Sequence, residues 1–233
     1  MTARLDKILS ESNILSRSES KAAAKKGRLA VNGVPVKTCD VKIGDDDVIT
    51  LDGKEITRRH FFYIMMNKPQ GYVCSTDEPG SKTVLDLLRP EDRARNMFPA
   101  GRLDKDTVGL LLITNDGALA HDLLSPKKHV TKRYEFRCAH PLSSSDKEKL
   151  ENGVLIDGEM TKKAKVSSDG NTGSITITEG KFHQIKRMFI SVNNSIEFLK
   201  RVDFGPLTLD TSLEEGEYRF LTDKETEMLI NRE

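Results

Sequence analysis

The residues from Gly101 to Gly117 (GRLDKDTVGLLLITNDG) combine two aspartates with an apolar run. Asp104 and Asp106 lie in a charged loop that leads into a strand-like stretch, so a carboxylate there is held beside the core. Loops of this kind frequently hold catalytic groups. Two aspartates solvated in a turn beside Lys105 would give the same pattern, so the loop alone leaves both interpretations open.

A second stretch, from Glu179 to Phe189 (EGKFHQIKRMF), places cations on a helix with one buried face. The apolar residues of that face recur at helical spacing: Ile185, Met188, Phe189 and Val192. At about 100° per residue, Lys186 lies at the flank of the apolar stripe and Arg187 nearly opposite it. Lys186 then reaches an enclosed site while Arg187 faces solvent or phosphate. A solvated basic face fits the same residues, and His183 beside them fits a structural role.

A third stretch, Thr131 to Phe136 (TKRYEF), places an aromatic residue among cations. Alternation along a strand puts Tyr134 and Phe136 on one face. Tyrosine is a common core residue, but an aromatic ring among cations also stacks on an unpaired RNA base.

Residues 1–59 have the pattern of a small domain with two helices followed by short strands. The first helix is predicted around residues 4–9. The second begins with a capping box of Ser16 and Glu19 and ends at Gly27. Turns are predicted at Asn32-Gly33 and Asp52-Gly53, and strands beside them at 29–31, 34–36 and 48–51.

Residues 60–233 alternate strands with short helices, which predicts a larger α+β domain with a mixed, mostly antiparallel sheet and flanking helices. The strands are predicted at 61–66, 110–114, 134–139, 164–167, 174–178, 196–202 and 218–221. The helices are predicted at 84–88, 118–124, 146–151 and 184–192, with a last helix after Thr222. Capping boxes are predicted for two of them, Ser145 with Glu148 and Thr222 with Glu225.

Charge is distributed unevenly along the chain. The 37 Lys and Arg nearly balance the 36 Asp and Glu, for a net charge of +1. Residues 1–43, however, hold nine Lys/Arg against four Asp/Glu (+5), whereas residues 210–233 hold three against eight (−5). Basic pairs recur at 127–128, 132–133, 186–187 and 200–201. Such clusters favour a nucleic-acid partner, although solvated surfaces produce them too.

Other classes of protein are disfavoured. Cys39, Cys74 and Cys138 are widely separated and form no CxxC pair, which argues against a disulfide framework and a zinc site. The longest aliphatic run, Leu110 to Ile113, is too short to span a bilayer, and residues 1–13 do not resemble a secretory signal. We therefore expect a protein of the cytoplasm, with no membrane contact.

The first 59 residues resemble the small RNA-binding domain named after ribosomal protein S-four. The resemblance rests on the order of helix, helix and hairpin, and on cations spaced along the helices. Six of these cations are expected to contact RNA: Arg4, Lys7, Arg17, Lys21, Lys25 and Arg28.

The whole chain resembles the pseudouridine synthases. GRLDKDTVGLLLIT is similar to their catalytic motif, TKRYEF to their tyrosine motif and EGKFHQIKRMF to their third motif, and the three occur in the family's order. The lead-in strand and loop, Phe61 to Gly71, match as well. The N-terminal domain and the form of the third motif most resemble the RsuA-like branch, which acts on small-subunit ribosomal RNA.

The resemblance implies roles for individual residues. Asp104 would be the nucleophile, Lys186 would keep it ionised, and Tyr134 would stack on the flipped uracil and assist proton transfer. Arg102 would fill the space that the base vacates or hold a neighbouring phosphate. His183, Gln184 and Arg187 would contact RNA. The reaction needs no cofactor and no metal. Some members of the wider family have Arg where Lys186 stands here, so the partner of Asp104 is Lys186 or Arg187.

The expected substrate is 16S ribosomal RNA or a small-subunit assembly intermediate, bound by a monomer. Two alternatives share these motifs. One is a synthase acting on large-subunit (23S) RNA, whose members tend to have Arg in place of His183. The other is a catalytically silent RNA-binding factor in ribosome assembly, which the presence of Asp104, Tyr134 and Lys186 disfavours.

Overall fold

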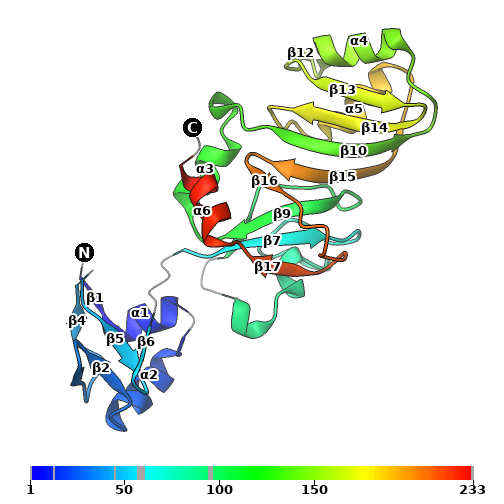
Figure 1. Ribbon diagram of the computed structural model, residues 1–233. Coiled ribbons are helices and arrows are strands. Elements are labelled where there is room, and N and C mark those ends of the chain that lie inside the picture. The colour runs from blue at the N-terminus through cyan, green and yellow to red at the C-terminus, as the bar shows by residue number, and fades with distance from the viewer. Residues whose placement is uncertain (1, 13, 45, 57–60, 94–96, 232–233) are drawn as a thin grey trace. The chain divides into compact units, whose positions relative to one another are not determined.

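The computed structural model describes residues 2–231, apart from 13, 45, 57–60 and 94–96 (Figure 1). The chain divides into two compact units, Met1–Phe62 with Arg89–Asn96, and Tyr63–Leu88 with Met97–Glu233. The boundary predicted after residue 59 falls among residues outside the described part of the chain.

The first unit consists of two helices and short strands around one apolar core. Its elements are β1 (Ala3–Arg4), α1 (Leu5–Glu11), α2 (Arg17–Lys25), β2 (Leu29–Val31), β3 (Val34–Pro35), β4 (Lys42–Ile43), β5 (Ile49–Leu51), β6 (Lys54–Glu55) and the 3-10 turn η2 (Pro90–Asp92). The strands pair in the order β3-β2-β5-β6, and β1 pairs with β4. Helices and strands both contribute to the core, which includes Leu5, Leu9, Ala24, Leu29, Ile43 and Ile49.

Local signals determine much of this unit. The capping box of α2 forms as predicted: the Glu19 amide donates to Ser16 Oγ at 3.2 Å, and the Ser16 amide donates to Glu19 Oε2 at 2.8 Å. Asn32 and Gly33 both adopt positive φ, 51° and 78°, as the tight turn between β2 and β3 requires. Short-range sequence patterns are therefore sufficient to place α2 and this hairpin.

The second unit is built on a nine-stranded sheet (Figure 1). Its main path is β13-β14-β10-β15-β9-β7-β17, with β16 paired to β15 and β8 paired to β9. Only β9 and β15 are parallel among the described strands of this sheet. The strands are β7 (Tyr63–Lys68), β8 (Phe98–Ala100), β9 (Val108–Thr114), β10 (Lys132–Cys138), β13 (Lys165–Asp169), β14 (Thr172–Ile177), β15 (Ile196–Phe204), β16 (Leu207–Thr208) and β17 (Tyr218–Phe220). The predicted α+β class with a mixed, mostly antiparallel sheet is confirmed.

Short helices and one small hairpin flank this sheet. They are the 3-10 turns η1 (Val84–Leu87) and η3 (Pro126–Lys128), the helices α3 (Gly117–Leu124), α4 (Ser144–Asn152), α5 (Gln184–Ser191) and α6 (Asp223–Ile230), and the hairpin of β11 (Leu155–Ile156) and β12 (Glu159–Met160). None of the helices within the described ranges is long and apolar enough to cross a membrane.

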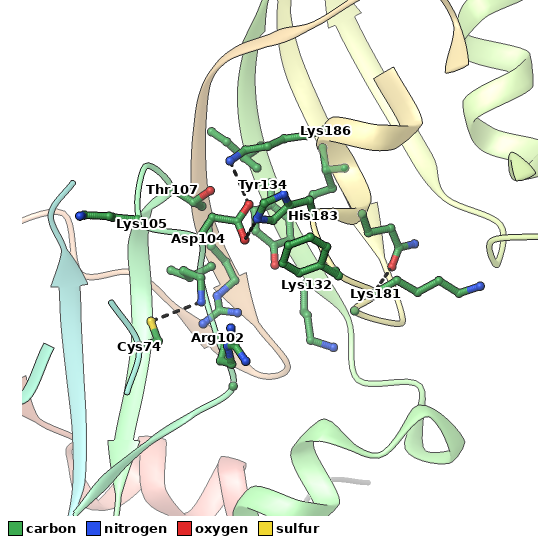
Figure 2. Close-up of a pocket in the computed structure, with 18 of the residues that line it drawn as sticks. Cys74, Arg102, Asp104, Lys105, Thr107, Lys132, Tyr134, Lys181, His183 and Lys186 are labelled. Carbon is green, nitrogen blue, oxygen red and sulfur yellow. Dashed lines mark hydrogen bonds and ion pairs between the residues drawn. The ribbon is translucent and has the colours of Figure 1, made fainter. Parts of the chain in front are cut away.

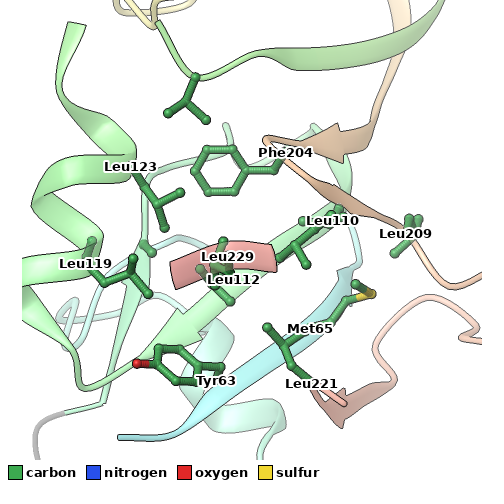
Figure 3. Packing of buried hydrophobic residues seen from close by; sticks show 14 residues of the cluster. Tyr63, Met65, Leu110, Leu112, Leu119, Leu123, Phe204, Leu209, Leu221 and Leu229 are labelled. Carbon is green, nitrogen blue, oxygen red and sulfur yellow. The ribbon is translucent and has the colours of Figure 1, made fainter. Parts of the chain in front are cut away.

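The core beside β9 fixes the strand that follows the Asp104 loop. Figure 3 shows side chains of β7, β9, α3 and α6 packed together, including Met65, Leu110, Leu112, Leu119, Leu123 and Leu229. All seven residues of β9 are buried. The loop before β9 therefore ends on a rigid strand.

The structure corrects three predicted elements. The capping box of α4 is formed by Ser143 with Asp146 and not by Ser145 with Glu148: both serines have a carboxylate three residues later, and the helix begins after the first of them. Residues 84–87 form a 3-10 turn and not an α-helix. The strand predicted from Phe61 begins at Tyr63.

Candidate active site

A cavity of about 680 Å³ lies within the second unit (Figure 2). Its walls come from segments that are distant in sequence: the loop before β9, the inner face of β10 and β15, and the residues that lead into α5. The sheet order brings these segments together, because β15 lies between β9 and β10. All three sequence stretches with candidate catalytic residues contribute to this one cavity.

Asp104 lies in the cavity beside two cationic or ionisable side chains. Lys186 Nζ is 2.9 Å from Asp104 Oδ2, and His183 Nε2 is 3.5 Å from Oδ1. Lys186 Nζ also donates to Asp106 Oδ1 at 2.5 Å. The Asp104 side chain keeps 26% of its surface exposed, so it is partly desolvated and still open to a ligand. This arrangement holds the Asp104 carboxyl group against an ammonium group at the cavity wall.

The pKa of Lys186 reflects two opposing effects. Burial favours the neutral amine, but the hydrogen bonds to Asp106 and Asp104 outweigh it and raise the pKa above the ordinary value. Burial of Asp106 acts to raise its pKa, yet the hydrogen bond from Lys186 lowers it overall. Lys186 is therefore a cation shared by two carboxylates.

Buried polar groups hold the Asp104 loop in place. Lys68, fully buried at the end of β7, donates from Nζ to the carbonyls of Thr107 (2.9 Å) and Pro69 (3.0 Å). The amide of Gly71 donates to the carbonyl of Lys105 at 2.8 Å. The amide of Leu103 donates to Cys74 Sγ at 3.3 Å (Figure 2). Hydrogen bonds with Lys68, Gly71 and Cys74 thus hold the loop in place.

Tyr134 lines the same cavity from β10 and is 7% exposed. Asp104 and His183 line this cavity too (Figure 2). The alternation predicted for this strand is observed, with residues 132, 134, 136 and 138 buried. An aromatic face, a carboxylate and an ammonium group therefore meet in one enclosure.

The chain is similar to known proteins over most of its length. Residues 62–191 match the family model described as RNA pseudouridylate synthase, and residues 3–49 match that of the S4 domain. A solved structure described as a pseudouridylate synthase is 40% identical, with a TM-score of 0.69, and covers 97% of this chain and 99% of its own. The chain belongs to the RNA pseudouridine synthase family. It carries an N-terminal S4 domain.

Two relatives illustrate how fully this synthase matches the family. A protein of Bacillus subtilis named as an uncharacterized RNA pseudouridine synthase is 47% identical and covers 97% of this chain and 98% of its own. The ribosomal small subunit pseudouridine synthase A of Escherichia coli is 38% identical and covers 97% of this chain and 100% of its own.

The structure distinguishes Lys186 from Arg187 in the synthase. Arg187 forms a two-point ion pair with Asp157, in the turn between β11 and β12, and does not line the cavity. The partner of Asp104 is therefore Lys186. Arg187 stays 28% exposed, at the edge of α5 that faces this turn.

The other predicted RNA contacts of this unit differ in exposure. Arg102 is exposed at the cavity and has no ion pair with any residue that the structure describes. His183 has a left-handed backbone (φ 49°), and its ring stacks on Phe182, whose surface is 70% exposed. Gln184 is buried, and its amide group bonds to Glu179 and to the backbone of Lys181. Its side chain thus stabilises the turn into α5.

The cations of the S4 domain also fall into two groups. Arg17, Lys21 and Lys25 are exposed along α2 and form no ion pair with another described residue. Arg4 pairs with Asp6 and Asp40, and Arg28 pairs with Asp52. Lys7 is exposed on α1. Of the six predicted RNA contacts in this domain, the three on α2 therefore have positive charge that no described acidic residue neutralises.

Sequence reasoning missed three buried cations of the site: Lys68, Lys132 and Arg201. The alternation that places Tyr134 inside also places Lys132 inside, so that signal was present in the sequence. Arg201 had no comparable signal, because its position depends on the pairing of β15 with β9 and β10. Within the described ranges, no group of three or more His, Cys, Asp or Glu is placed to hold a metal ion.

Proposed function

We propose that this synthase converts a specific uridine of small-subunit (16S) ribosomal RNA to pseudouridine, with Asp104 as the nucleophile. The observation that carries the proposal is the contact of Lys186 Nζ with Asp104 Oδ2 at 2.9 Å, inside a cavity that Tyr134 also lines. Relatives named ribosomal small subunit pseudouridine synthase A, such as the Escherichia coli and Vibrio vulnificus proteins, support the proposed substrate.

The chemistry rearranges one nucleotide without an external reactant. The bond between the ribose C1′ and the uracil N1 breaks, the base turns, and C1′ bonds to C5. The proton on C5 is lost, and N1 gains a proton. A carboxylate suits this sequence because it traps the electron-poor intermediate and then leaves again.

Each residue of the site has a role in this proposal. Lys186 keeps Asp104 ionised in a partly desolvated cavity. Tyr134 stacks on the flipped uracil and assists proton transfer at carbon. Arg102, exposed at the cavity, fills the space that the base leaves in the RNA or holds a neighbouring phosphate.

RNA affinity comes from more than this cavity. The exposed cations of α2 bind phosphates, which position the RNA without reading its sequence. The active species of this proposal is a monomer. We expect the protein in the cytoplasm, where ribosomes are assembled.

The substrate is tested by mapping pseudouridines in all ribosomal RNA from cells with and without this protein. The expected result is the loss of one or a few sites in small-subunit RNA, restored by the wild-type gene and not by Asp104→Asn. Loss of a site in large-subunit RNA would overturn the assignment of the substrate. An unchanged map would favour a silent RNA-binding factor.

A further inference from the structure

Two buried cations lie in the cavity apart from the Asp104–Lys186 pair. Arg201 on β15 is 1% exposed and Lys132 on β10 is 8% exposed, and both line the cavity. Strand pairing places them near Tyr134, which is opposite Arg201 and two residues along the strand from Lys132. Lys132, Tyr134 and Arg201 therefore form one wall, which we call the Tyr134 wall.

Neither cation is neutralised by a carboxylate. Arg201 donates from Nε to the carbonyl of Leu110 at 2.8 Å, and its buried Nη2 has no hydrogen-bond partner among the described residues. Lys132 donates from Nζ to the carbonyl of Val130 at 3.2 Å. No ion pair joins either side chain to an acidic residue in the part of the chain that the structure describes.

Both cations lie over one aromatic ring. The guanidinium carbon of Arg201 is 4.8 Å from the centroid of the Phe204 ring, and Lys132 Nζ is 5.7 Å from it. These contacts lessen the cost of burying the charges. They leave both N–H donors of Arg201 Nη2 without a hydrogen-bond partner among the described residues.

Two buried cations without a counter-ion are unfavourable in the free protein. Burial and the nearby charge of Arg201 lower the pKa of Lys132 to about 8, so the ammonium form is kept at a cost. Asp104 does not relieve this cost, because its ion pair is with Lys186. The Tyr134 wall therefore has positive charge to offer to an incoming anion or carbonyl group.

The burial of Lys132 and Arg201 indicates which part of the RNA can reach them. An RNA phosphate stays on the outside of the polynucleotide and is matched by exposed cations such as Arg102. A flipped base enters the enclosure and stacks on Tyr134, with its edge beside the two cations. The group that fits Lys132 and Arg201 is therefore the carbonyl edge of the uracil.

We propose that Lys132 and Arg201 hold the uracil carbonyl oxygens and stabilise the negative charge that the base gains as it detaches. This inference rests on the proposed function. When the C1′–N1 bond breaks, its electron pair stays with uracil and spreads over N1, O2 and O4. When C5 bonds to C1′, the charge returns to the new bond, and the proton of C5 is released. Preorganised donors of this kind act on the transition state more than on the bound substrate.

The test compares leaving groups of different acidity. Small-subunit ribosomal RNA is transcribed with uridine or with 5-fluorouridine, and conversion of the N-glycoside to the C-glycoside is measured under single turnover at saturating enzyme. In 5-fluorouridine C5 has no proton to release, so its product is counted as the C-glycoside in which C5 still bears fluorine. Fluorine withdraws electrons and stabilises the detached base, so the reaction depends less on the two cations. Lys132→Met and Arg201→Met should slow the uridine reaction about 100-fold or more. The factor by which they slow the 5-fluorouridine reaction should be at least tenfold smaller.

Matched variants complete the experiment. Lys163→Met removes one charge from an exposed side chain that does not line the cavity, and should slow both substrates equally and by less than threefold. Arg201→Lys keeps the charge on a smaller side chain, and gives the same comparison of substrates if Arg201→Met fails to fold. Wild-type turnover of uridine tests the proposed function separately from the inference.

Two outcomes would overturn the inference. Equal rate losses on both substrates would show that the cations only support the fold of the cavity. A loss of affinity with an unchanged rate at saturation would show that they hold a phosphate.

Discussion

At the scale of single residues, Lys186 and Arg187 are neighbours with different partners. Lys186 contacts Asp104 in the cavity, and Arg187 binds Asp157 outside it. Lys186→Met should lower the single-turnover rate by about 100-fold or more, because Asp104 loses the ammonium group that pairs with it in the cavity. Arg187→Met should change that rate by less than threefold, and should act mainly on RNA affinity. A larger rate loss in Arg187→Met would contradict this assignment.

A pH dependence of stability follows from Lys132. Its pKa is lowered to about 8 in the folded chain, and it returns to about 10.4 on unfolding. Between these two pH values the unfolded state binds more protons than the folded state. The free energy of unfolding of the wild type therefore rises with pH, by up to about 1.4 kcal/mol per pH unit. Lys132→Met lacks this gain. From pH 7 to pH 9.5, the free energy of unfolding in urea should increase more for the wild type than for Lys132→Met. A constant difference between the two proteins would rule out a lowered pKa of Lys132.

At the scale of elements, the parallel contact of β9 with β15 depends on Gly109. This residue has φ +101°, and a Cβ there would lie 2.3 Å from the backbone oxygen of Arg201. Gly109→Ala should lower the free energy of unfolding by about 2 kcal/mol or more. Gly117→Ala is the control, since no atom lies within 4 Å of its Cβ position. The measurement is the free energy of chemical unfolding of both variants. Equal values for Gly109→Ala and Gly117→Ala would show that β9 and β15 can accommodate a side chain between them.

Local elements were predictable, and their pairing was not. The capping box of α2, the turn at Asn32-Gly33 and the apolar face of α5 depend on neighbours in sequence, and all three match the predictions. Strands of two residues, such as β11 and β12, are too short to leave a periodic pattern. Strand order comes from long-range packing, so Arg201 was recognised only when β15 was seen between β9 and β10.

At the scale of the whole molecule, the charge of the first 43 residues should govern the salt dependence of RNA binding. The triple variant Arg17→Gln, Lys21→Gln and Lys25→Gln removes three exposed cations from α2. The slope of log affinity against log salt should fall by about 2 to 3, because fewer counter-ions are displaced. The rate at saturating RNA should change little.

A second triple variant controls for total charge. Lys149→Gln, Lys163→Gln and Lys165→Gln remove three exposed cations from the second unit, away from the cavity residues. Their slope should stay close to that of the wild type. Equal slopes in the two triple variants would show that α2 has no special role, and the S4 domain would then be assigned a protein partner.

The two aspartates of the loop test the account most directly. Asp104 and Asp106 both contact Lys186, yet Asp106 is more exposed, at 68% of its side chain against 26%. The test is the amount of pseudouridine formed per RNA in a single turnover, with RNA binding measured in parallel. Asp104→Asn should form no pseudouridine and still bind RNA, and Asp106→Asn should stay within about tenfold of the wild-type rate. Near wild-type activity in Asp104→Asn would contradict the assignment of the nucleophile.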